Sequence, residues 1–245
     1  FPMVGSSDSI ADANTTLNAI VAESFCEAAD ELEKAADFDS ACTKLIHDMM
    51  TEHQRIVFNG NGYTSEWVEE AHKRGLFDLP SCAEAFPRLI AEKNVELFLK
   101  HGIYTKEEIQ ARFEIHVENY RNILVIEATT MVDMIRHQIL PAVSRYSADL
   151  CSRANAKATA GVSHRYESDT AQVISALTDA LMDACSALEE DLRAMPADPQ
   201  EAMNFCHKVL TGHMAEARAA ADQLEEHTAS EYWPFPVYAD LMFSV

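Results

Sequence analysis

The chain has 245 residues, of which 48% are hydrophobic, enough for one large domain or two small ones with a substantial buried core. Its 40 acidic side chains outnumber the 19 basic ones and give a formal charge of −21. Such a charge would repel a phosphate backbone or an anionic membrane surface, so we expect neither nucleic acid nor a membrane as a partner.

The composition also predicts the fold class. Only 7 Gly and 8 Pro interrupt the chain, while Ala, Leu, Glu and Met are plentiful, which favours long helices and an all-α fold. The six cysteines have no CxxC spacing, and several lie on predicted apolar helix faces, where a thiol acts as a small hydrophobe. With no signal-peptide pattern and no stretch of about twenty apolar residues, we expect a soluble, cytoplasmic protein.

The N-terminal third predicts several shorter helices. Residues 1–14 have no clear period and should be irregular, and a helical pattern begins at Thr15, with Asn14 or Thr15 as its cap. A second short helix is expected over residues 39–52. Its predicted inward residues are Cys42, Leu45, Ile46 and Met49.

An irregular segment follows at residues 55–63. It contains Asn59-Gly60-Asn61-Gly62, which predicts a tight turn because Gly and Asn tolerate positive φ. Gly60 and Gly62 complete neither GxxxxGK[ST] nor GxGxxG, so a structural turn is favoured over a phosphate cradle.

Two more short helices are predicted before the middle of the chain. They cover residues 64–74 and 88–100, and each is closed by a glycine, Gly75 and Gly102. The residues between these two helices, with Pro80 and Pro87, are expected to form a loop.

The longest predicted element is a helix over about residues 105–153, which at 1.5 Å per residue is roughly 70 Å long. Thr105 and Glu108 form a capping box at its start. Pro141 removes a backbone donor and predicts a kink near His137 to Pro141, but not an end, since the apolar stripe resumes at once. That stripe is formed by Ile109, Phe113, Val117, Tyr120, Leu124, Ala128, Met131, Ile135, Ile139, Val143, Tyr146 and Leu150.

Two further long helices are expected at about residues 166–195 and 200–228, after a loop at residues 154–163 and with a break at Pro196 and Pro199. The predicted inward residues of the first are Val173, Leu177, Leu181, Ala184, Leu188 and Leu192. Those of the second are Met203, Cys206, Leu210, Met214, Ala217, Ala221 and Leu224. The three long helices predict an antiparallel bundle, to which the shorter N-terminal helices are added.

The C-terminal tail is aromatic and rich in proline. Residues 232–238 should therefore not be helical and should lie against another element. Our hypothesis is that residues 233–245 pack back toward the helices within residues 15–52, using the apolar area of their aromatic rings.

Residue types alone identify no active site. Glu69-x-x-His72 has the spacing of one di-iron unit, but a second such motif is missing, so an exposed polar face is favoured over a metal site. Glu127 lies within the longest helix between apolar residues, and a half-buried carboxylate there would need a partner; structural pairing is favoured over catalysis. Cys206-His207 gives no recognisable nucleophile and base. We therefore predict no catalytic and no metal-binding residue.

Several strings of the sequence carry information beyond their periodicity. They are RIVFNGNGYTSEWVEEAHKRGL (residues 55–76), AEKNVELFLKHGIYT (91–105), NYRNILVIEATTMVDMIRHQILPAVSRY (119–146) and WPFPVYADLMFSV (233–245). They closely resemble the C-terminal region of type III glutamine synthetases, and the resemblance covers nearly the whole chain. The opening FPMVGSSDSIADANTTLNAIVAE is similar to the segment after the last active-site motif of that family. The implied domains are the end of the catalytic domain with the first helix (1–37) and a C-terminal helical domain (38–245).

The resemblance implies a parent glutamate–ammonia ligase of nitrogen metabolism, which makes glutamine through a γ-glutamyl phosphate formed from ATP with divalent Mg or Mn. In the family, the last active-site motif contains a metal-binding Glu and a substrate-binding Arg just before the Met-Val-Gly-Ser-Ser segment, which here is residues 3–7. On that register the Glu would precede Phe1, and Pro2 occupies the Arg position, so no site residue is carried over.

The chain begins with Phe1-Pro2 and not with Met, so we expect a piece of a longer protein. This piece should be inactive alone and hold no cofactor. Its expected role is structural and oligomer-forming, with the upstream catalytic domain and neighbouring subunits of a ring-shaped homo-oligomer as partners. The alternative is a free-standing helical interaction or regulatory module derived from a synthetase.

Overall fold

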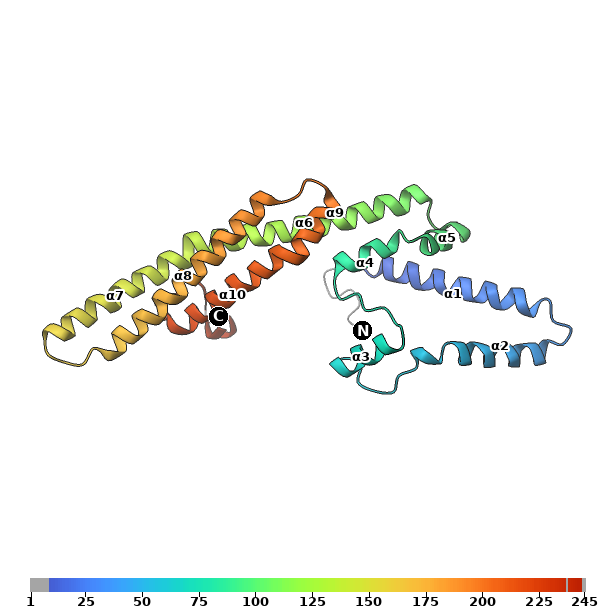
Figure 1. The fold of residues 1–245 in the computed structure, drawn as a ribbon, viewed down its shortest axis with the longest axis horizontal. Coiled ribbons are helices and arrows are strands. Elements are labelled where there is room, and N and C mark those ends of the chain that lie inside the picture. Colours follow the sequence, from blue (N-terminus) through green and yellow to red (C-terminus); the bar gives the residue numbers. More distant parts are fainter. Residues whose placement is uncertain (1–8, 237, 244–245) are drawn as a thin grey trace. The chain divides into compact units, whose positions relative to one another are not determined.

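The computed structural model describes residues 9–236 and 238–243, in which all regular structure is helical and no strand is present (Figure 1). The predicted all-α fold is therefore confirmed. The chain divides into two compact units, residues 1–114 and 115–245, and the division falls inside one long helix.

Unit 1 begins with a helical hairpin of α1 (Ala11–Leu32) and α2 (Phe38–Glu52) (Figure 1). Helix α1 begins earlier than expected, and neither Asn14 nor Thr15 caps it. The backbone N–H of Ala11 instead donates to Ser9 Oγ at 3.2 Å. Alanines and an acidic residue in the first turn suit a helix start, because they combine high helix propensity with a favourable interaction with the helix dipole.

The short helices of unit 1 follow a 3₁₀ turn at Gln54–Ile56. They are α3 (Ser65–Lys73), α4 (Cys82–Leu89) and α5 (Glu92–Lys100). Gly75 and Gly102 follow α3 and α5 with φ of 70° and 62°, the left-handed conformation of a closing glycine, as predicted.

Helix α4 occupies a segment that was predicted as a loop, so that expectation is wrong. Ser81 Oγ accepts from the backbone N–H of Glu84 at 3.3 Å and donates to its carboxylate at 2.8 Å, which is a capping box. Pro87 lies inside the helix. In so short a helix it removes one hydrogen bond, and the cap at Ser81 still fixes the start.

The core of unit 1 is small. Ala19, Phe98 and Ile109 are buried together, and Glu23 of α1 accepts from Lys100 Nζ at 2.5 Å and contacts His101 Nε2 at 2.7 Å. The partly buried hydrophobic residues around this core are Leu89, Ile90, Val95, Leu97, Ile103 and Tyr104.

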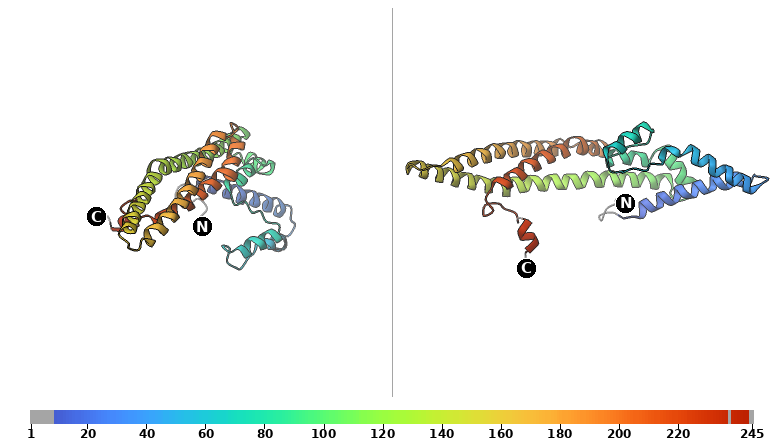
Figure 2. Two further views of the ribbon diagram at one scale, coloured as in Figure 1. Left: turned by 60° about the vertical axis from the view of Figure 1, so that its left-hand side comes forward. Right: turned by 90° about the horizontal axis from the view of Figure 1, so that it is seen from below.

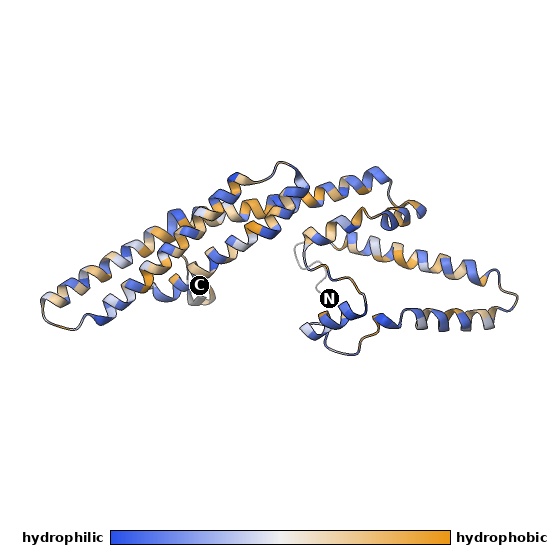
Figure 3. Cartoon of the chain, in the orientation of Figure 1, coloured by the Kyte–Doolittle hydropathy of each residue, from blue (hydrophilic) through white to orange (hydrophobic). Residues whose placement is uncertain are grey.

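Helix α2 fully buries none of its residues: Cys42 and Leu45 of its predicted inward face are partly buried, and the prediction is wrong for Ile46 and Met49. Ile46 is 57% exposed, and Met49 is exposed as well. Within unit 1 this helix packs chiefly against α1 and the 3₁₀ turn, and its Phe38 and Met50 are exposed too. Figure 3 shows hydrophobic and hydrophilic residues interspersed along the helices of this unit.

The long helix runs without interruption from Lys106 to Thr159 as α6 (Lys106–Met134), a π-helical turn (Ile135–Ile139) and α7 (Leu140–Thr159). The predicted capping box is present: Thr105 Oγ1 accepts from Glu108 N–H at 3.2 Å, and the Glu108 carboxylate accepts from Thr105 N–H at 2.8 Å. The disturbance expected just before Pro141 takes the form of the π turn, in which Leu140 N–H donates to Ile135 O.

The long helix continues beyond residue 153, where it was expected to end. Ala154, Ala156 and Ala158 are strong helix formers, so the chain stays helical. The helix closes at Gly161, which has a φ of 71° and donates to Ala158 O at 3.0 Å while Val162 N–H donates to Lys157 O at 3.0 Å.

Two more long helical segments follow in unit 2. They are α8 (Arg165–Ala194) and a continuous run of α9 (Pro199–Phe205), a second π turn (Cys206–Leu210) and α10 (Thr211–His227). Figures 1 and 2 show α8 lying along α7 and α10 lying along α8, as in the predicted antiparallel bundle.

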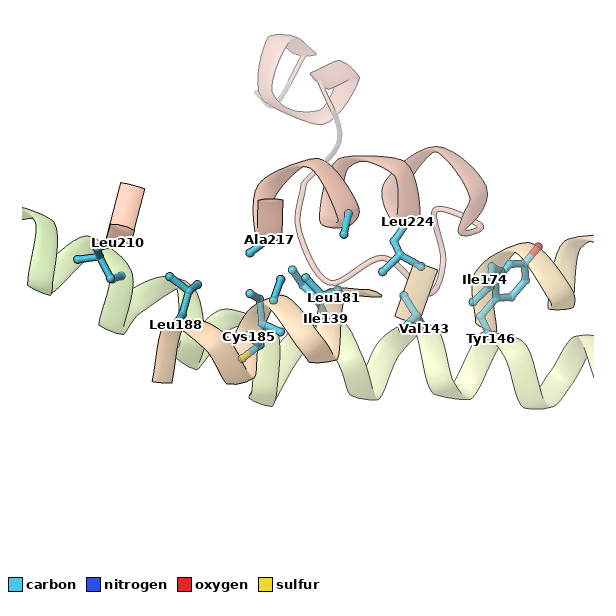
Figure 4. Packing of buried hydrophobic residues seen from close by; sticks show 14 of the residues in the cluster. Ile139, Val143, Tyr146, Ile174, Leu181, Cys185, Leu188, Leu210, Ala217 and Leu224 are labelled. Carbon is cyan, nitrogen blue, oxygen red and sulfur yellow. The ribbon is translucent and has the colours of Figure 1, made fainter. Parts of the chain in front are cut away.

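The bundle core is extensive and is formed by side chains from α6, α7, α8 and α10 (Figure 4). Val173 was predicted inside but is 40% exposed, and its neighbour Ile174 is fully buried instead. The buried members of the core are Ala128, Ile135, Ile139, Val143, Tyr146, Leu150, Ile174, Leu181, Ala184, Cys185, Leu188, Cys206, Leu210, Ala217, Ala220 and Leu224.

The tail after α10 packs against this same core through Tyr232, Trp233 and Phe235. The hypothesis that placed its aromatic rings on the helices within residues 15–52 is wrong for these residues, because the bundle supplies the apolar surface that they cover. Helix α11 (Tyr238–Phe243) follows, so the chain becomes helical again at its end, and its Phe243 is exposed.

Candidate functional site

Glu69 and His72 form no metal site. Both side chains are exposed on α3, and His72 Nε2 lies 3.3 Å from Asp78 Oδ2. Within residues 9–236 and 238–243, no group of three or more His, Cys, Asp or Glu side chains is placed to hold a metal ion.

The segment that contains Gly60 and Gly62 is a structural loop. Neither glycine has a positive φ, so the expectation that positive φ explains the glycines of this turn is wrong. A Cβ on Gly60 would lie 2.3 Å from Phe58 Cζ, so the glycine is required for the close approach of the ring. A Cβ on Gly62 would meet only Trp67 Cδ1, at an ordinary contact distance of 4.0 Å, so the packing explains the glycine at position 60 and not the one at position 62.

Arg74 of α3 holds this loop in place. Its Nη1 donates to Val57 O at 2.8 Å and Arg55 O at 3.2 Å, and its Nε donates to Glu70 Oε1 at 2.6 Å. The guanidinium also lies 5.8 Å from the centres of the stacked Phe58 and Trp67 rings. These contacts fix the conformation of the loop, which gives Arg74 a structural role.

Cys206 is not a reactive nucleophile. It is fully buried in the bundle core, and its Sγ lies 3.7 Å from Met195 Sδ. Burial raises the pKa of the Cys206 thiol, which keeps it protonated at neutral pH.

Two ion pairs join neighbouring helices of the bundle. Arg136 donates to both carboxylate oxygens of Glu189, at 2.9 and 3.1 Å. Lys157 pairs with the buried Glu167 across the turn between α7 and α8, and this bond lowers the pKa of Glu167. Both pairs therefore have a structural role between helices.

A cluster of tyrosines joins α7 to the tail. The rings of Tyr146 and Tyr232 are 5.0 Å apart, and Tyr232 OH donates to Asp149 at 3.1 Å. Asp149 also accepts from Arg153 at 2.7 Å. Burial, with a hydrogen bond to Tyr166, raises the pKa of Tyr146 to about 12, so this hydroxyl stays protonated and serves as a packing group.

A pocket of about 570 Å³ lies in unit 2 between α6 with its π turn, α10 and the segment Trp233–Pro236. Its floor includes Ile135, Ile139 and Ala217 from the bundle core. Its other lining residues are Ile126, Glu127, Thr130, Met131, Met134, Met214, Arg218, Ala221, Asp222, Glu225, Trp233, Phe235 and Pro236.

Glu127 is therefore a pocket residue and not a half-buried carboxylate paired within the bundle. Its side chain is exposed, while the next residue, Ala128, is fully buried. The apolar residues beside Glu127 in the sequence gave a misleading indication, because Ile126 is also exposed and lines the same pocket.

Comparison with known proteins places the chain in a family. Residues 41–158 match the family model of the glutamine synthetase C-terminal domain. A glutamine synthetase of Butyrivibrio fibrisolvens is 33% identical over 206 residues, which cover 82% of this chain and 29% of that protein.

Two other relatives match along the chain. The type-3 glutamine synthetase of Dictyostelium discoideum is 30% identical over 99% of this chain and 35% of its own length. A glutamine synthetase of Bacteroides fragilis (strain YCH46) is 24% identical over 100% of this chain and 35% of its own length. The chain thus spans about a third of the length of these relatives. In its described part, no helix combines the length and apolar character needed to cross a membrane.

Proposed function

Because the chain belongs to the glutamine synthetase family through its C-terminal domain, we propose that it is the helical C-terminal part of a type-3 glutamine synthetase. The parent enzyme would make glutamine from glutamate, ammonia and ATP in the cytoplasm. The observation that carries this proposal is similarity along 99% of the chain to 35% of the type-3 relative.

We propose that ATP and the divalent metal, Mg or Mn, bind to the part of the parent enzyme that lies outside this chain. The residues described here do not fit a metal ion, since no group of three or more suitable side chains comes together among them. Pro2, which replaces the family's substrate-binding Arg, lies outside the described residues, so that prediction stays a prediction. The same holds for a domain boundary between residues 37 and 38, which we retain as part of the proposal.

The role proposed for the chain is to dock on the catalytic domain and on neighbouring subunits of a ring-shaped oligomer. Support comes from α1 and α2, where large apolar side chains remain uncovered by the described chain. Exposed apolar area of this kind is typical of an interface. These exposed residues are Leu17, Ile20, Val21, Phe25, Phe38, Ile46, Met49 and Met50.

The first test is an assay of the purified 245-residue chain with glutamate, ammonia, ATP and Mg²⁺ or Mn²⁺. We expect no glutamine, because the chain supplies no metal-binding group of its own in its described part. Turnover that follows the chain through purification would contradict the assignment of the chemistry to the rest of the parent.

The second test uses the parent enzyme with Phe25→Asp and Ile46→Asp, which place charges on α1 and α2. We expect smaller oligomers by light scattering and loss of activity, with unchanged helical content. Asn18→Asp is the matched control, because it adds the same charge at an exposed polar position of α1. If the double variant assembles normally, α1 and α2 are not the interface. The reading frame upstream of this chain is a further test. If it encodes no synthetase sequence, the alternative of a free-standing interaction module is supported.

A further inference from the structure

We propose that the pocket between α6, α10 and Trp233–Pro236 binds a small organic cation with an apolar body, such as an aryl-alkyl ammonium. The inference does not depend on the synthetase role, so the two proposals stand or fall separately.

The size of the pocket indicates a small molecule. Its volume of about 570 Å³ lies within the range of ligand sites, roughly 300 to 1,000 Å³. A helix about 10 Å wide would fill this volume within about 7 Å of its length, which is less than two turns. The pocket is therefore too short for the docking of a partner helix.

The floor and walls indicate an apolar body. Ile135, Ile139 and Ala217 are buried members of the bundle core, so the pocket is a hollow above a complete core. Met131, Met134 and Met214 line it with flexible thioethers that adapt to ligands of different shape. When the apolar groups of a ligand replace water on such a surface, the free energy decreases, which is not the case in a polar cavity.

The aromatic side chains indicate a positive charge on the ligand. Trp233 and Phe235 line the pocket with rings at 76° to each other and centres 6.0 Å apart. An ammonium group near the face of either ring would be attracted by the ring quadrupole.

The charged side chains that line the pocket also favour a positively charged ligand. Arg218 is the lining cation, and Asp222 already pairs with it at 2.6 Å. The side-chain carboxylates of Glu127 and Glu225 have no hydrogen-bond or ion-pair partner in the part of the chain that the structure describes. Two unpaired carboxylates beside a neutralised pair attract a cation and repel an anion.

The test compares three probes of nearly equal shape: 4-phenylbutylammonium, 4-phenylbutanol and 4-phenylbutanoate. The sequence contains 2 Trp, so Trp67→Phe leaves Trp233 as the only tryptophan and its fluorescence reports on the pocket. We expect the ammonium to bind at least tenfold more tightly than the carboxylate, with the alcohol between them. The preference should decrease as salt is added, because the carboxylates are exposed.

Variants locate the site. Glu127→Gln and Glu225→Gln should each weaken ammonium binding roughly two- to fivefold, as expected for exposed charge pairs, and leave the alcohol unchanged. Ala221→Phe should abolish binding of all three probes by filling the pocket. Asp183→Asn, at an exposed position of α8 outside the pocket, is the control.

The proposal fails if no ammonium binding occurs at millimolar concentration, or if the carboxylate binds as well as the ammonium. It also fails if Glu127→Gln and Glu225→Gln bind the ammonium as tightly as Asp183→Asn does. Both glutamates are exposed, so these substitutions do not disturb the fold. Circular dichroism of Ala221→Phe checks that its loss of binding is not a loss of structure.

Discussion

Unit 1 and unit 2 are both built from helices with apolar stripes, yet they bury them very differently. In unit 2, α7, α8 and α10 meet along their lengths, and large side chains such as Leu181 and Leu188 are fully buried. In unit 1, the α1–α2 hairpin leaves Phe25 72% exposed and buries only Ala19. The comparison teaches that a periodic stripe becomes a core only where a third element covers it.

The difference has an energetic meaning. Full burial of one large apolar side chain contributes about 1.5 to 3 kcal/mol, so unit 2 draws its stability from within the chain. The exposed stripe of α1 and α2 contributes only when another surface covers it. We therefore expect unit 2 to be the more stable unit in the isolated chain.

The largest effect that tests this comparison is Leu181→Ala in α8. It should lower the free energy of unfolding of unit 2 by about 2 to 5 kcal/mol, because it leaves a cavity in the bundle core. Urea unfolding followed by Trp233 fluorescence in a Trp67→Phe background measures it. The matched change in unit 1, Ile46→Ala, should alter unfolding followed by Trp67 by about 0.5 kcal/mol or less. Equal losses in the two units would remove the distinction between them.

A smaller effect is expected at the best-fixed point of unit 1. Arg74→Met removes the donors that hold Val57 O and Arg55 O, and should lower local stability by about 1 to 2 kcal/mol. Amide hydrogen exchange of residues 55–62 should speed up accordingly, with Trp67 fluorescence changing at the same time. Arg88→Met is the control, since Arg88 is exposed and lies 5.2 Å from the Phe77 ring. Unchanged exchange in the Arg74 variant would mean that the loop is held by its stacked rings alone.

The smallest effect concerns pH and unit 2. His213 Nδ1 lies 2.6 Å from the buried Asp191, and this hydrogen bond raises the pKa of His213. A raised pKa means that the folded state binds the proton more tightly, so the stabilisation is complete below about pH 6.5 and is lost as pH rises through the folded pKa. We expect unit 2 to lose about 1 kcal/mol between pH 6 and 8.5, a modest value because His213 is partly exposed.

His213→Gln should flatten this pH dependence, measured by urea unfolding at each pH. His137→Gln is the control, because His137 is an exposed residue 3.7 Å from an exposed carboxylate, Asp133. If the slope persists without His213, other groups cause it, and the pair with Asp191 is only a packing contact.

Local signals in the sequence were enough for most helices. The capping box at Thr105 and Glu108 and the stripes of the three long helices depend on neighbours three or four positions apart, so they predict helices that the structure confirms. Helix α4 was also visible in principle through Ser81 and Glu84. The prolines at positions 80 and 87 predicted a loop instead, although a proline in a helix of eight residues removes a single hydrogen bond.

Burial could not be predicted in the same way, because it depends on what covers a face. Ile46 and Met49 have the spacing of a buried stripe and remain exposed, while Glu127 lies at the edge of a pocket and not within the core. The pocket itself brings Glu127 together with Glu225 and Trp233, residues about a hundred positions away. No local sequence pattern encodes contacts between residues so far apart in the chain, so the sequence could not predict this pocket.

The π turn at Ile135–Ile139 has a consequence for how the gene can change. A regular α-helix turns by about 100° per residue, so losing one codon elsewhere in the long helix would rotate Val143 and Leu150 away from the core. A π turn holds one extra residue, and deleting a residue there returns it to an α-helix with both flanking segments in phase. We therefore expect homologous chains one residue shorter at this point to keep the same bundle, which makes the π turn the natural place for length variation in this helix.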